Sequence, residues 1–358
     1  MVMAIWRPET GSRRVTTRAR APLRLGFAGG GTDLSPYCDE FGGAVLNGTI
    51  DRYAYAFIQP RDDGKVVFRS HDLGIEETFD DPREAAFSKL ALHRGVYLRM
   101  LRDHAQEFVP SVTLTTTVDA PAYSGLGSSS ALMVALVDAY CAFLDLPLGR
   151  YDVARLAFDI ERVDLKLSGG RQDQYAAAFG GLNFIEFLAE NRVIVNPLRT
   201  SVAVNNELES SLVICFSGQS RQSALIIDEQ VAGMTTRSER TLEALHRLKV
   251  DAVDMKQALL GGDVAGMAEI LDRSWDSKKA TAHNISNPHI DHLYAAAKAA
   301  GALGGKISGA GGGGFMMFIC APEDRWALIE ALTDAGGRAS AVKFTHQGCE
   351  TWQVRGRA

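Results

Sequence analysis

The sequence predicts an α+β protein built as two lobes, and three observations support this fold class. The chain has 358 residues, which is more than one hydrophobic core usually organises, so two domains are expected. Strand-like and helix-like segments are mixed along the chain, as in α+β proteins. A polar, turn-rich stretch at residues 196–211 is the expected boundary. This boundary places one domain at residues 1–200 and the second at 201–358.

The composition is that of an ordinary globular protein, and it argues against a nucleic-acid-binding function. Hydrophobic residues make up 46% of the chain and charged residues 23%. The formal net charge of −5 gives no sign of a surface that binds polyanions. One basic cluster near the N-terminus is the exception, and we interpret it as a solvated arm rather than a phosphate site. It consists of Arg13, Arg14, Arg18 and Arg20.

The five cysteines argue against a disulfide framework and against a zinc site, because their number is odd and no two have CxxC spacing. The N-terminal segment lacks the apolar core of a signal peptide. No run of residues approaches the ~20 apolar residues of a membrane span. A cytoplasmic protein without membrane association is therefore expected, and the sequence leaves a homodimer open.

In the first half of the chain, apolar periodicity predicts strands and helices. Residues 15–59 are expected to form strands interrupted by a glycine-rich turn, and a threonine-rich strand is expected at 111–118. The segment 129–144 is apolar on nearly every side, which is typical of a buried helix. The other expected elements are a strand at 66–69, helices at 84–107 and 151–166, and a strand pair over 181–195.

The second half of the chain is richer in helical periodicity. A short strand is expected at 212–216, and a glycine-rich loop at 309–314 leads directly into an apolar strand at 315–320. A last helix and strand follow this loop. The three helices expected between the first strand and the loop cover 235–260, 263–280 and 288–300.

The most specific feature is the segment PAYSGLGSSSA at residues 121–131, here called the serine loop, which precedes the buried helix. Its glycines allow the backbone to approach a ligand closely. The N-terminus of the following helix presents unpaired N–H groups and the positive end of its dipole. Together these features favour a phosphate site, with hydroxyls available to phosphate oxygens or Mg²⁺. No lysine precedes the serines as in a Walker A loop, and the alternative is a serine-capped helix after a turn.

The segment KISGAGGGGF at residues 306–315, here called the glycine loop, contains a literal GxGxxG pattern. A dinucleotide-binding fingerprint needs a strand before the glycines and a helix after them. A strand follows the glycines here, so we exclude that interpretation. The glycines favour a backbone that packs against a ligand or a neighbouring loop, and simple tight turns are the alternative.

A third glycine cluster, RAPLRLGFAGGGTDL at residues 20–34, joins an expected strand to a turn that ends in Thr32 and Asp33. A carboxylate beyond a glycine-rich turn can accept hydrogen bonds from sugar hydroxyls. The alternative is that Asp33 caps a short helix.

These three segments, in this order, resemble the three motifs of the GHMP kinases, a family that includes galactokinase, mevalonate kinase and homoserine kinase. The serine loop resembles the family's ATP-phosphate loop, and the glycine loop resembles its C-terminal motif. The resemblance implies a two-lobed GHMP kinase fold. It consists of an N-terminal ATP-binding domain with a mixed sheet, a ferredoxin-like C-terminal domain and an active site in the cleft between them.

The N-terminal cluster indicates a branch of the family. It resembles the galactokinase signature but carries Gly30 and Gly31 where galactokinases carry Glu-His. In this respect it looks like the branch of heptose phosphate kinases and fucokinases. Losing two polar side chains removes hydrogen bonds to galactose, and we expect it to leave space for a larger or differently oriented sugar.

The resemblance also implies roles for individual residues. The segment GRQDQ at 170–174 resembles a Gly-x-x-Asp-Gln element, which makes Asp173 the expected catalytic base, with Arg24 assisting it. Glu161 resembles a magnesium-binding glutamate of the family and would hold Mg²⁺ together with Ser129; an exposed helix carboxylate is the alternative. The residues expected to bind ATP are Gly125, Leu126, Gly127, Ser128, Ser129, Ser130, Gly311 and Gly312. Those expected to bind the acceptor are Gly30, Gly31, Thr32, Asp33 and Arg171.

The function implied by the resemblance is an ATP- and Mg²⁺-dependent sugar kinase with a small-molecule acceptor. The branch suggests phosphorylation of D-glycero-D-manno-heptose 7-phosphate at its anomeric hydroxyl, for nucleotide-activated heptose and surface polysaccharide biosynthesis. The alternatives are a fucokinase or other neutral-sugar kinase, a decarboxylase of the same fold, and a non-catalytic regulator that binds sugar and ATP. Lys166 is interpreted as a solvated lysine. The residues available for a substrate phosphate are Arg171, Arg221, Lys278, Lys279 and His283.

Overall fold

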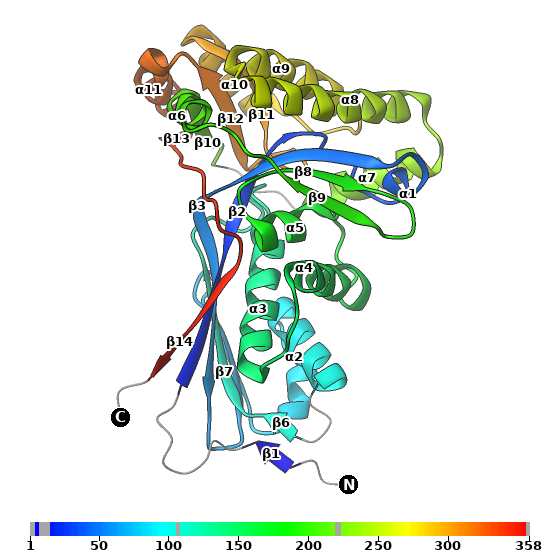
Figure 1. Ribbon diagram of the computed structural model, residues 1–358, viewed down its shortest axis with the longest axis vertical. Coiled ribbons are helices and arrows are strands. Elements are labelled where there is room, and N and C mark those ends of the chain that lie inside the picture. Colours follow the sequence, from blue (N-terminus) through cyan, green and yellow to red (C-terminus); the bar gives the residue numbers. More distant parts are fainter. Residues whose placement is uncertain (1–3, 7–14, 105–107, 219–222, 356–358) are drawn as a thin grey trace.

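The computed structural model describes residues 4–6, 15–104, 108–218 and 223–355, which form two lobes (Figure 1). Arg13, Arg14 and Arg221 lie outside the described residues. Within the described ranges, no helix is long and apolar enough to cross a membrane.

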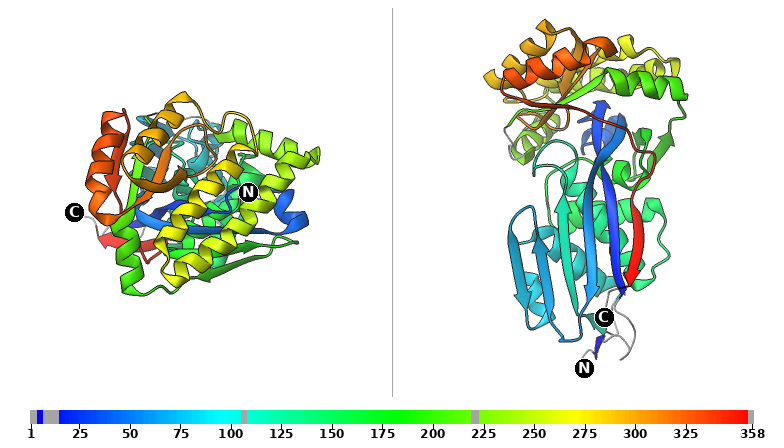
Figure 2. Two further views of the ribbon diagram at one scale, coloured as in Figure 1. Left: turned by 90° about the horizontal axis from the view of Figure 1, so that it is seen from above. Right: turned by 90° about the vertical axis from the view of Figure 1, so that its left-hand side faces the viewer.

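The first lobe is built on a mixed sheet with the strand order β14-β2-β3-β7-β4-β5. Its two longest strands, β2 (Val15–Ala28) and β3 (Gly43–Pro60), pair antiparallel and run the length of the lobe up to the second lobe (Figure 2). β4 and β7 pair in parallel, and the β8–β9 hairpin pairs with the first residues of β3. The shorter strands are β4 (Val66–Ser70), β5 (Ile75–Phe79), β7 (Val112–Val118), β8 (Leu182–Phe187), β9 (Val193–Pro197) and β14 (Glu350–Arg355). A separate parallel pair joins β1 (Ala4–Trp6) to β6 (Phe108–Pro110).

Helices cover one face of this sheet (Figure 1). α3 (Ser128–Leu144) lies centrally against β2 and β3 and is buried on nearly every side, as its apolar sequence predicts. Three helices pack around α3, namely α2 (Ala91–His104), α4 (Arg150–Phe158) and α5 (Gln172–Phe179). A π-helical segment at Asp159–Asp164 continues α4, and such segments are frequent at functional sites.

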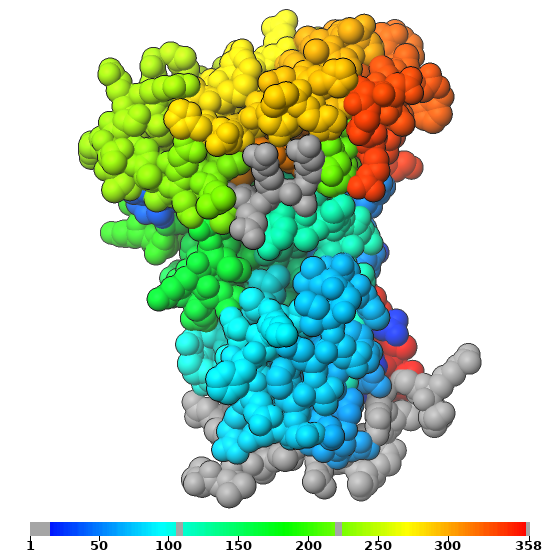
Figure 3. Space-filling view, turned by 180° about the vertical axis from the view of Figure 1, so that it is seen from behind, coloured from blue at the N-terminus to red at the C-terminus, as the bar shows by residue number. Residues whose placement is uncertain are grey.

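The second lobe contains an antiparallel sheet with the order β11-β12-β10-β13. Numbered along the chain from β10, this order is 2-3-1-4, which is the ferredoxin-like arrangement expected from the sequence. The space-filling view from behind shows this lobe seated across the top of the first (Figure 3). The strands are β10 (Leu212–Phe216), β11 (Ala302–Ile307), β12 (Phe315–Cys320) and β13 (Arg338–Ala341). The helices are α6 (Val202–Ser211), α7 (Ser223–Thr235), α8 (Glu239–Gly261), α9 (Val264–Lys279), α10 (Pro288–Ala299) and α11 (Arg325–Asp334).

The stretch at 196–211, expected to be irregular, contains the end of β9 and the whole of α6. Ser201 caps α6 by accepting a hydrogen bond from the Val204 N–H at 3.2 Å, and Leu208 is buried. After β13 the chain returns to the first lobe, where β14 pairs with β2. The last residues of the chain therefore contribute to the sheet of the first lobe, and a division into domains at residue 200 stays a prediction.

Several helix boundaries differ from the expectation. The helix expected at 84–107 begins as a 3₁₀ segment, Pro82–Phe87, and α2 starts only at Ala91. The helix expected at 151–166 is α-helical only as far as Phe158. α5 was not expected at all, because its eight residues lack a capping side chain and are too few for a clear helical period.

Candidate active site

The candidate site lies where the three glycine-rich segments meet, at the junction of the lobes. Gly125 of the serine loop packs tightly on the glycine loop, and a Cβ atom there would lie 2.3 Å from the Ser308 carbonyl oxygen. The Arg24 N–H donates a hydrogen bond to the Leu126 carbonyl at 3.0 Å. The Leu126 side chain itself is fully buried. Strand β2, the serine loop and the glycine loop are therefore held together largely through their backbones.

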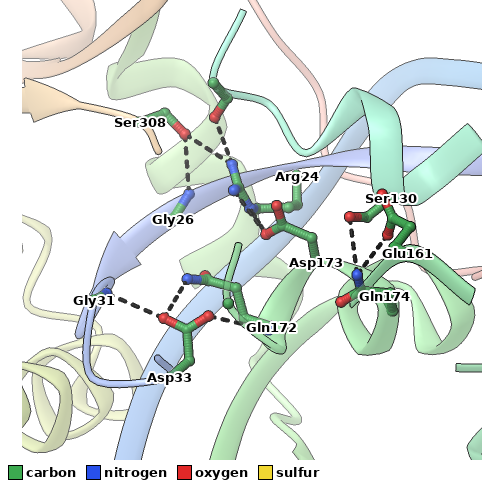
Figure 4. A network of polar contacts seen from close by, with 12 residues as sticks. Arg24, Gly26, Gly31, Asp33, Ser130, Glu161, Gln172, Asp173, Gln174 and Ser308 are labelled. Carbon is green, nitrogen blue, oxygen red and sulfur yellow. Dashed lines mark hydrogen bonds and ion pairs between the residues drawn. The ribbon is translucent and has the colours of Figure 1, made fainter. Parts of the chain in front are cut away.

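Arg24 on β2 is buried and holds the carboxylate of Asp173 from the first turn of α5 (Figure 4). Its Nε donates to Asp173 Oδ1 at 2.8 Å, and its Nη2 lies 2.7 Å from the same oxygen. Its Nη1 donates to the Gly125 carbonyl at 2.5 Å. The Asp173 Oδ2 atom faces the serine loop, where a Cβ atom on Gly127 would lie 3.3 Å from it. One oxygen of Asp173 is thus bound to Arg24, and the other lies beside the serine loop.

The start of α3 offers backbone donors beside Asp173. Its N-cap residue, Gly127, has a φ of 71° and no side chain that could cap the helix. The first intrahelical hydrogen bond is donated by the Ala131 N–H to the Gly127 carbonyl at 2.9 Å. Ser128 is partly exposed, Ser129 is exposed and Ser130 is buried. An uncapped helix start with a positive dipole end suits the phosphates of a nucleotide.

Glu161 is fully buried beside the start of α3, so it is not the exposed helix carboxylate of the alternative interpretation. Its Oε1 accepts a hydrogen bond from Ser129 Oγ at 2.9 Å. Its Oε2 accepts one from Gln174 Nε2 at 2.6 Å (Figure 4). The Arg162 guanidinium lies 3.8 Å from Oε1. The two residues expected to hold Mg²⁺ are therefore in direct contact with each other.

Glu161 and Ser129 fit Mg²⁺ as the ion of a metal–nucleotide complex. A carboxylate and a hydroxyl are hard oxygen ligands, and Mg²⁺ usually takes one or two protein ligands beside phosphate oxygens and water. In the described part of the chain, no cluster of three or more His, Cys, Asp or Glu side chains could hold a metal ion. The donor set here therefore suits an ion that arrives with ATP.

Asp33 ties the N-terminal glycine turn to the start of α5 (Figure 4). Its Oδ1 accepts hydrogen bonds from the Gly31 N–H and from Gln172 Nε2, both at 3.1 Å. The Gln172 N–H donates to Oδ2 at 3.2 Å. The short helix that follows Asp33, α1 (Tyr37–Phe41), has no side-chain cap, so Asp33 does not cap that helix.

Thr32, expected to contact the acceptor, is fully buried and holds the turn instead. Its hydroxyl lies 2.8 Å from the Gly29 carbonyl oxygen and 2.9 Å from the Ala44 carbonyl oxygen. The Ala44 N–H donates back to the same hydroxyl at 3.0 Å. The hydroxyl of Thr32 therefore positions its neighbour Asp33 by fixing the backbone between β2 and β3.

Lys278 from α9 fills space beside Gly30 and Gly31. Its Nζ donates to the Gly30 carbonyl at 3.2 Å, and a Cβ atom on Gly31 would lie 3.7 Å from Nζ. Burial lowers the pKa of Lys278 to about 8, an effect that the nearby Asp33 carboxylate opposes. The expectation that this glycine pair leaves open space for a larger sugar is therefore wrong in part, because a lysine of the second lobe occupies some of that space.

A second buried lysine, Lys306 in the glycine loop, was not singled out from the sequence. Its Nζ donates to the Gly26 carbonyl at 2.9 Å. Burial, together with the neighbouring positive charges of Lys278 and Arg24, lowers the pKa of Lys306 to about 7. Its place at the start of a recognised motif was the one available signal for it.

The remaining sequence candidates lie around this centre. Gly311 and Gly312 pack on Ile285, whose carbonyl accepts from the Gly312 N–H at 2.8 Å, and their contact with ATP stays a prediction. Arg171 is buried and lines a pocket together with Asp33. Three other basic residues are surface residues: Lys279 pairs with Asp276, His283 lies beside Glu229, and Lys166 is exposed.

Comparison with known proteins gives concordant results. The family model described as GHMP kinases N terminal domain matches residues 91–181, and the model described as GHMP kinases C terminal matches residues 255–338. The D-glycero-alpha-D-manno-heptose 7-phosphate kinase of Campylobacter jejuni is 42% identical over 95% of this chain and 99% of its own length. A crystal structure described as a D-glycero-D-manno-heptose 1-phosphate kinase from Bacteroides thetaiotaomicron superimposes with a TM-score of 0.79 at 40% identity, covering 94% of this chain and 99% of that one. A galactokinase from Lactococcus lactis, crystallised with galactose, has a TM-score of 0.73 at 21% identity and covers 95% of this chain and 96% of that one.

Proposed function

The chain belongs to the GHMP kinase family of phosphotransferases, and we propose on that basis that it is an ATP-dependent heptose phosphate kinase. It moves the γ-phosphate of ATP to the anomeric hydroxyl of D-glycero-D-manno-heptose 7-phosphate. The observation that carries the proposal is the Asp173 carboxylate, anchored by Arg24 beside an uncapped helix start that suits phosphate. The Campylobacter relative, 42% identical, supports the choice of acceptor. Residues 1–200 are proposed to form the ATP-binding domain and 201–358 the C-terminal domain.

ATP is proposed to place its phosphates on the serine loop and the first N–H groups of α3. Phosphoryl transfer depends mainly on positioning and on neutralising charge, and both are available here. Glu161 and Ser129 would hold Mg²⁺, which when bound neutralises charge on the phosphate oxygens. Arg24 contributes positive charge and keeps Asp173 in place.

In the transfer step, the anomeric oxygen attacks the γ-phosphorus as the bond from that phosphorus to ADP breaks. The hydroxyl proton passes to Asp173, and Oδ2 is the suitable oxygen because the Arg24 bonds occupy Oδ1. The product carries a phosphate at its anomeric carbon. Such a sugar phosphate is the form that nucleotide activation requires, which supports the proposed role in nucleotide-activated heptose and surface polysaccharide biosynthesis.

The metal requirement offers a direct test of Glu161. Glu161→Gln should raise the Mg²⁺ concentration needed for half-maximal ADP release by roughly 10–100-fold, the range usual for losing an interaction that supports a metal site. The substitution removes the negative charge but keeps the size of the side chain. Titration of Mn²⁺ by electron paramagnetic resonance, with ATP present, measures the same loss without turnover.

Ser129→Ala should show a smaller change in the same direction, because it removes the other proposed oxygen ligand. Glu207→Gln, at an exposed position of α6, is the matched control and should keep the wild-type Mg²⁺ requirement and Mn²⁺ affinity. A wild-type Mg²⁺ requirement and Mn²⁺ affinity in Glu161→Gln would remove Glu161 from the proposed metal site.

The acceptor is tested by an ADP-release screen over heptose 7-phosphate, unphosphorylated heptose, fucose, galactose, mannose and mevalonate. Heptose 7-phosphate should give the highest kcat/KM, exceeding that of galactose by at least ~10²-fold, because sites built for particular hydroxyl groups reject mismatched sugars strongly. Fucose as the best acceptor would favour a fucokinase. Binding of ATP and sugar without ADP release would favour a non-catalytic regulator.

A further inference from the structure

Arg171 is a buried arginine that is only partly satisfied. It is the N-cap residue of α5, two positions before Asp173, and its side chain is 8% exposed. Its Nη2 donates to Ser35 Oγ at 2.7 Å and to Asp39 Oδ1 at 2.8 Å. Its Nε and Nη1 are buried and have no hydrogen-bond partner among the described residues. Buried donors of a charged group are costly to leave unpaired, so an unmet pair of donors marks a place for a ligand.

Arg171 lines a pocket of about 240 Å³ that lies against Asp33 on one side. Ile227, Asp228 and Val231 of α7 also line it, so the pocket lies between residues of both halves of the chain. The Phe158 ring, 5.8 Å from the centre of the guanidinium, packs beside Arg171. A volume below the roughly 300–1,000 Å³ of drug-sized sites suits one end of a small polar ligand.

The pocket is lined by carboxylates as well as by guanidinium groups. The two carboxylates that line it already accept hydrogen bonds: Asp33 from Gln172 and Gly31, and Asp228 from Ser168 Oγ at 2.7 Å. Arg162 also lines the pocket, and its hydrogen bonds to protein acceptors are all long, at 3.4 Å. The unpaired donors are those of the Arg171 guanidinium, and a guanidinium group matches the oxygens of a phosphate group.

Consecutive residues at the start of α5 place their side chains in the order that a phosphorylated acceptor would need. Asp173 turns toward Arg24 and the serine loop, while its neighbour Gln172 bonds to Asp33 (Figure 4). Arg171, one residue earlier, reaches toward Ser35 and the pocket. A single ligand can therefore present a reacting hydroxyl to Asp173, further polar groups near Asp33 and an anionic end to Arg171.

We propose that this pocket binds the phosphate monoester that the sugar acceptor already carries, and that Arg171 is the main residue that contacts this phosphate. The proposal rests on the proposed function, because it takes the acceptor to be a sugar phosphate. It assigns Arg171 to acceptor selectivity rather than to the transfer step. Lys278, which donates to the Gly30 carbonyl, is not part of the pocket lining.

The test compares two acceptors that differ only in the distal phosphate. In the wild type, kcat/KM for heptose 7-phosphate should exceed that for unphosphorylated heptose by ~10²-fold or more, as expected for charge-assisted hydrogen bonds. In Arg171→Met this ratio should fall by at least ~10-fold. Arg171→Lys keeps the charge but not the fork of donors and should give an intermediate ratio. Arg192→Met, at an exposed arginine outside the site, is the matched control and should keep the wild-type ratio.

A measurement on the wild type covers the case in which the Arg171 variants do not fold. Inorganic phosphate should inhibit competitively against heptose 7-phosphate and should not compete with unphosphorylated heptose. The assignment of Arg171 to the acceptor phosphate would be overturned if Arg171→Met lowered kcat/KM by the same factor for both acceptors. It would also be overturned if inorganic phosphate competed equally with both, or if the wild type worked best on an unphosphorylated sugar. Another sugar phosphate could prove to be the best acceptor, with Arg171→Met lowering its kcat/KM relative to the same sugar without phosphate. That result would support the phosphate pocket and contradict only the proposed identity of the acceptor.

Discussion

Replacing Asp173 by asparagine should lower kcat by at least ~10²-fold while ATP still binds, which is the usual scale for removing a general base. Asparagine keeps a side-chain oxygen that can accept the hydrogen bonds from Arg24, so we expect the local structure to be retained. It cannot take the proton of the acceptor hydroxyl. Single-turnover phosphoryl transfer measures the chemical step, and calorimetry with Mg²⁺ measures the affinity for ATP.

Asp80→Asn is the matched control for this variant, because Asp80 is 81% exposed and pairs with Lys65 on the surface. It should retain the wild-type kcat. A chemical step in Asp173→Asn within a few fold of the wild-type rate would show that Asp173 is not the base. Loss of ATP binding together with turnover would instead assign Asp173 to the integrity of the serine loop.

The local chemistry of the site was accessible from the sequence, because each glycine-rich segment carries its own signal. The serine loop precedes a helix that is apolar on all sides, and that combination predicts both a buried helix and an exposed N-terminus. The ferredoxin-like second lobe was predicted through the family resemblance. The pairing of Arg24 with Asp173 was suggested only by the family resemblance, because 149 positions separate the two residues and their contact depends on how β2 and α5 pack.

The burial of Glu161 shows why periodicity alone fell short. A regular helix over 151–166 would rotate each residue by a constant angle, and on that pattern an exposed carboxylate was a reasonable alternative. The π-helical segment at Asp159–Asp164 changes the rotation per residue, and Glu161 is fully buried in it. Lys278 was one of five candidates for a substrate phosphate, and its contact with Gly30 could not be predicted, because that contact depends on the docking of α9 from the other lobe.

The backbone contact between the serine loop and the glycine loop leads to the second large expected effect. Gly125→Ala should lower kcat/KM for ATP by at least ~10²-fold, because an added Cβ atom would lie 2.3 Å from the Ser308 carbonyl oxygen, where no rotamer change can relieve the clash. The serine loop or the glycine loop must then move. Displacements of about 1 Å in an active site can cost ~10² in rate. The same movement would disturb the Arg24 bond to the Gly125 carbonyl and so the placement of Asp173.

A second glycine separates this contact effect from ordinary backbone strain. Gly125 has a φ of +79° and Gly74 a φ of +64°, so alanine is strained at both positions, by about 1–2 kcal/mol. A Cβ atom on Gly74 would meet no atom within 4 Å. Gly74→Ala should therefore lower the melting temperature and leave ATP binding intact, whereas Gly125→Ala should weaken ATP binding even well below its melting temperature. If calorimetry found the same ATP affinity in both variants, the two loops would not depend on this contact. The docking of the serine loop on the glycine loop would then not be what positions the nucleotide.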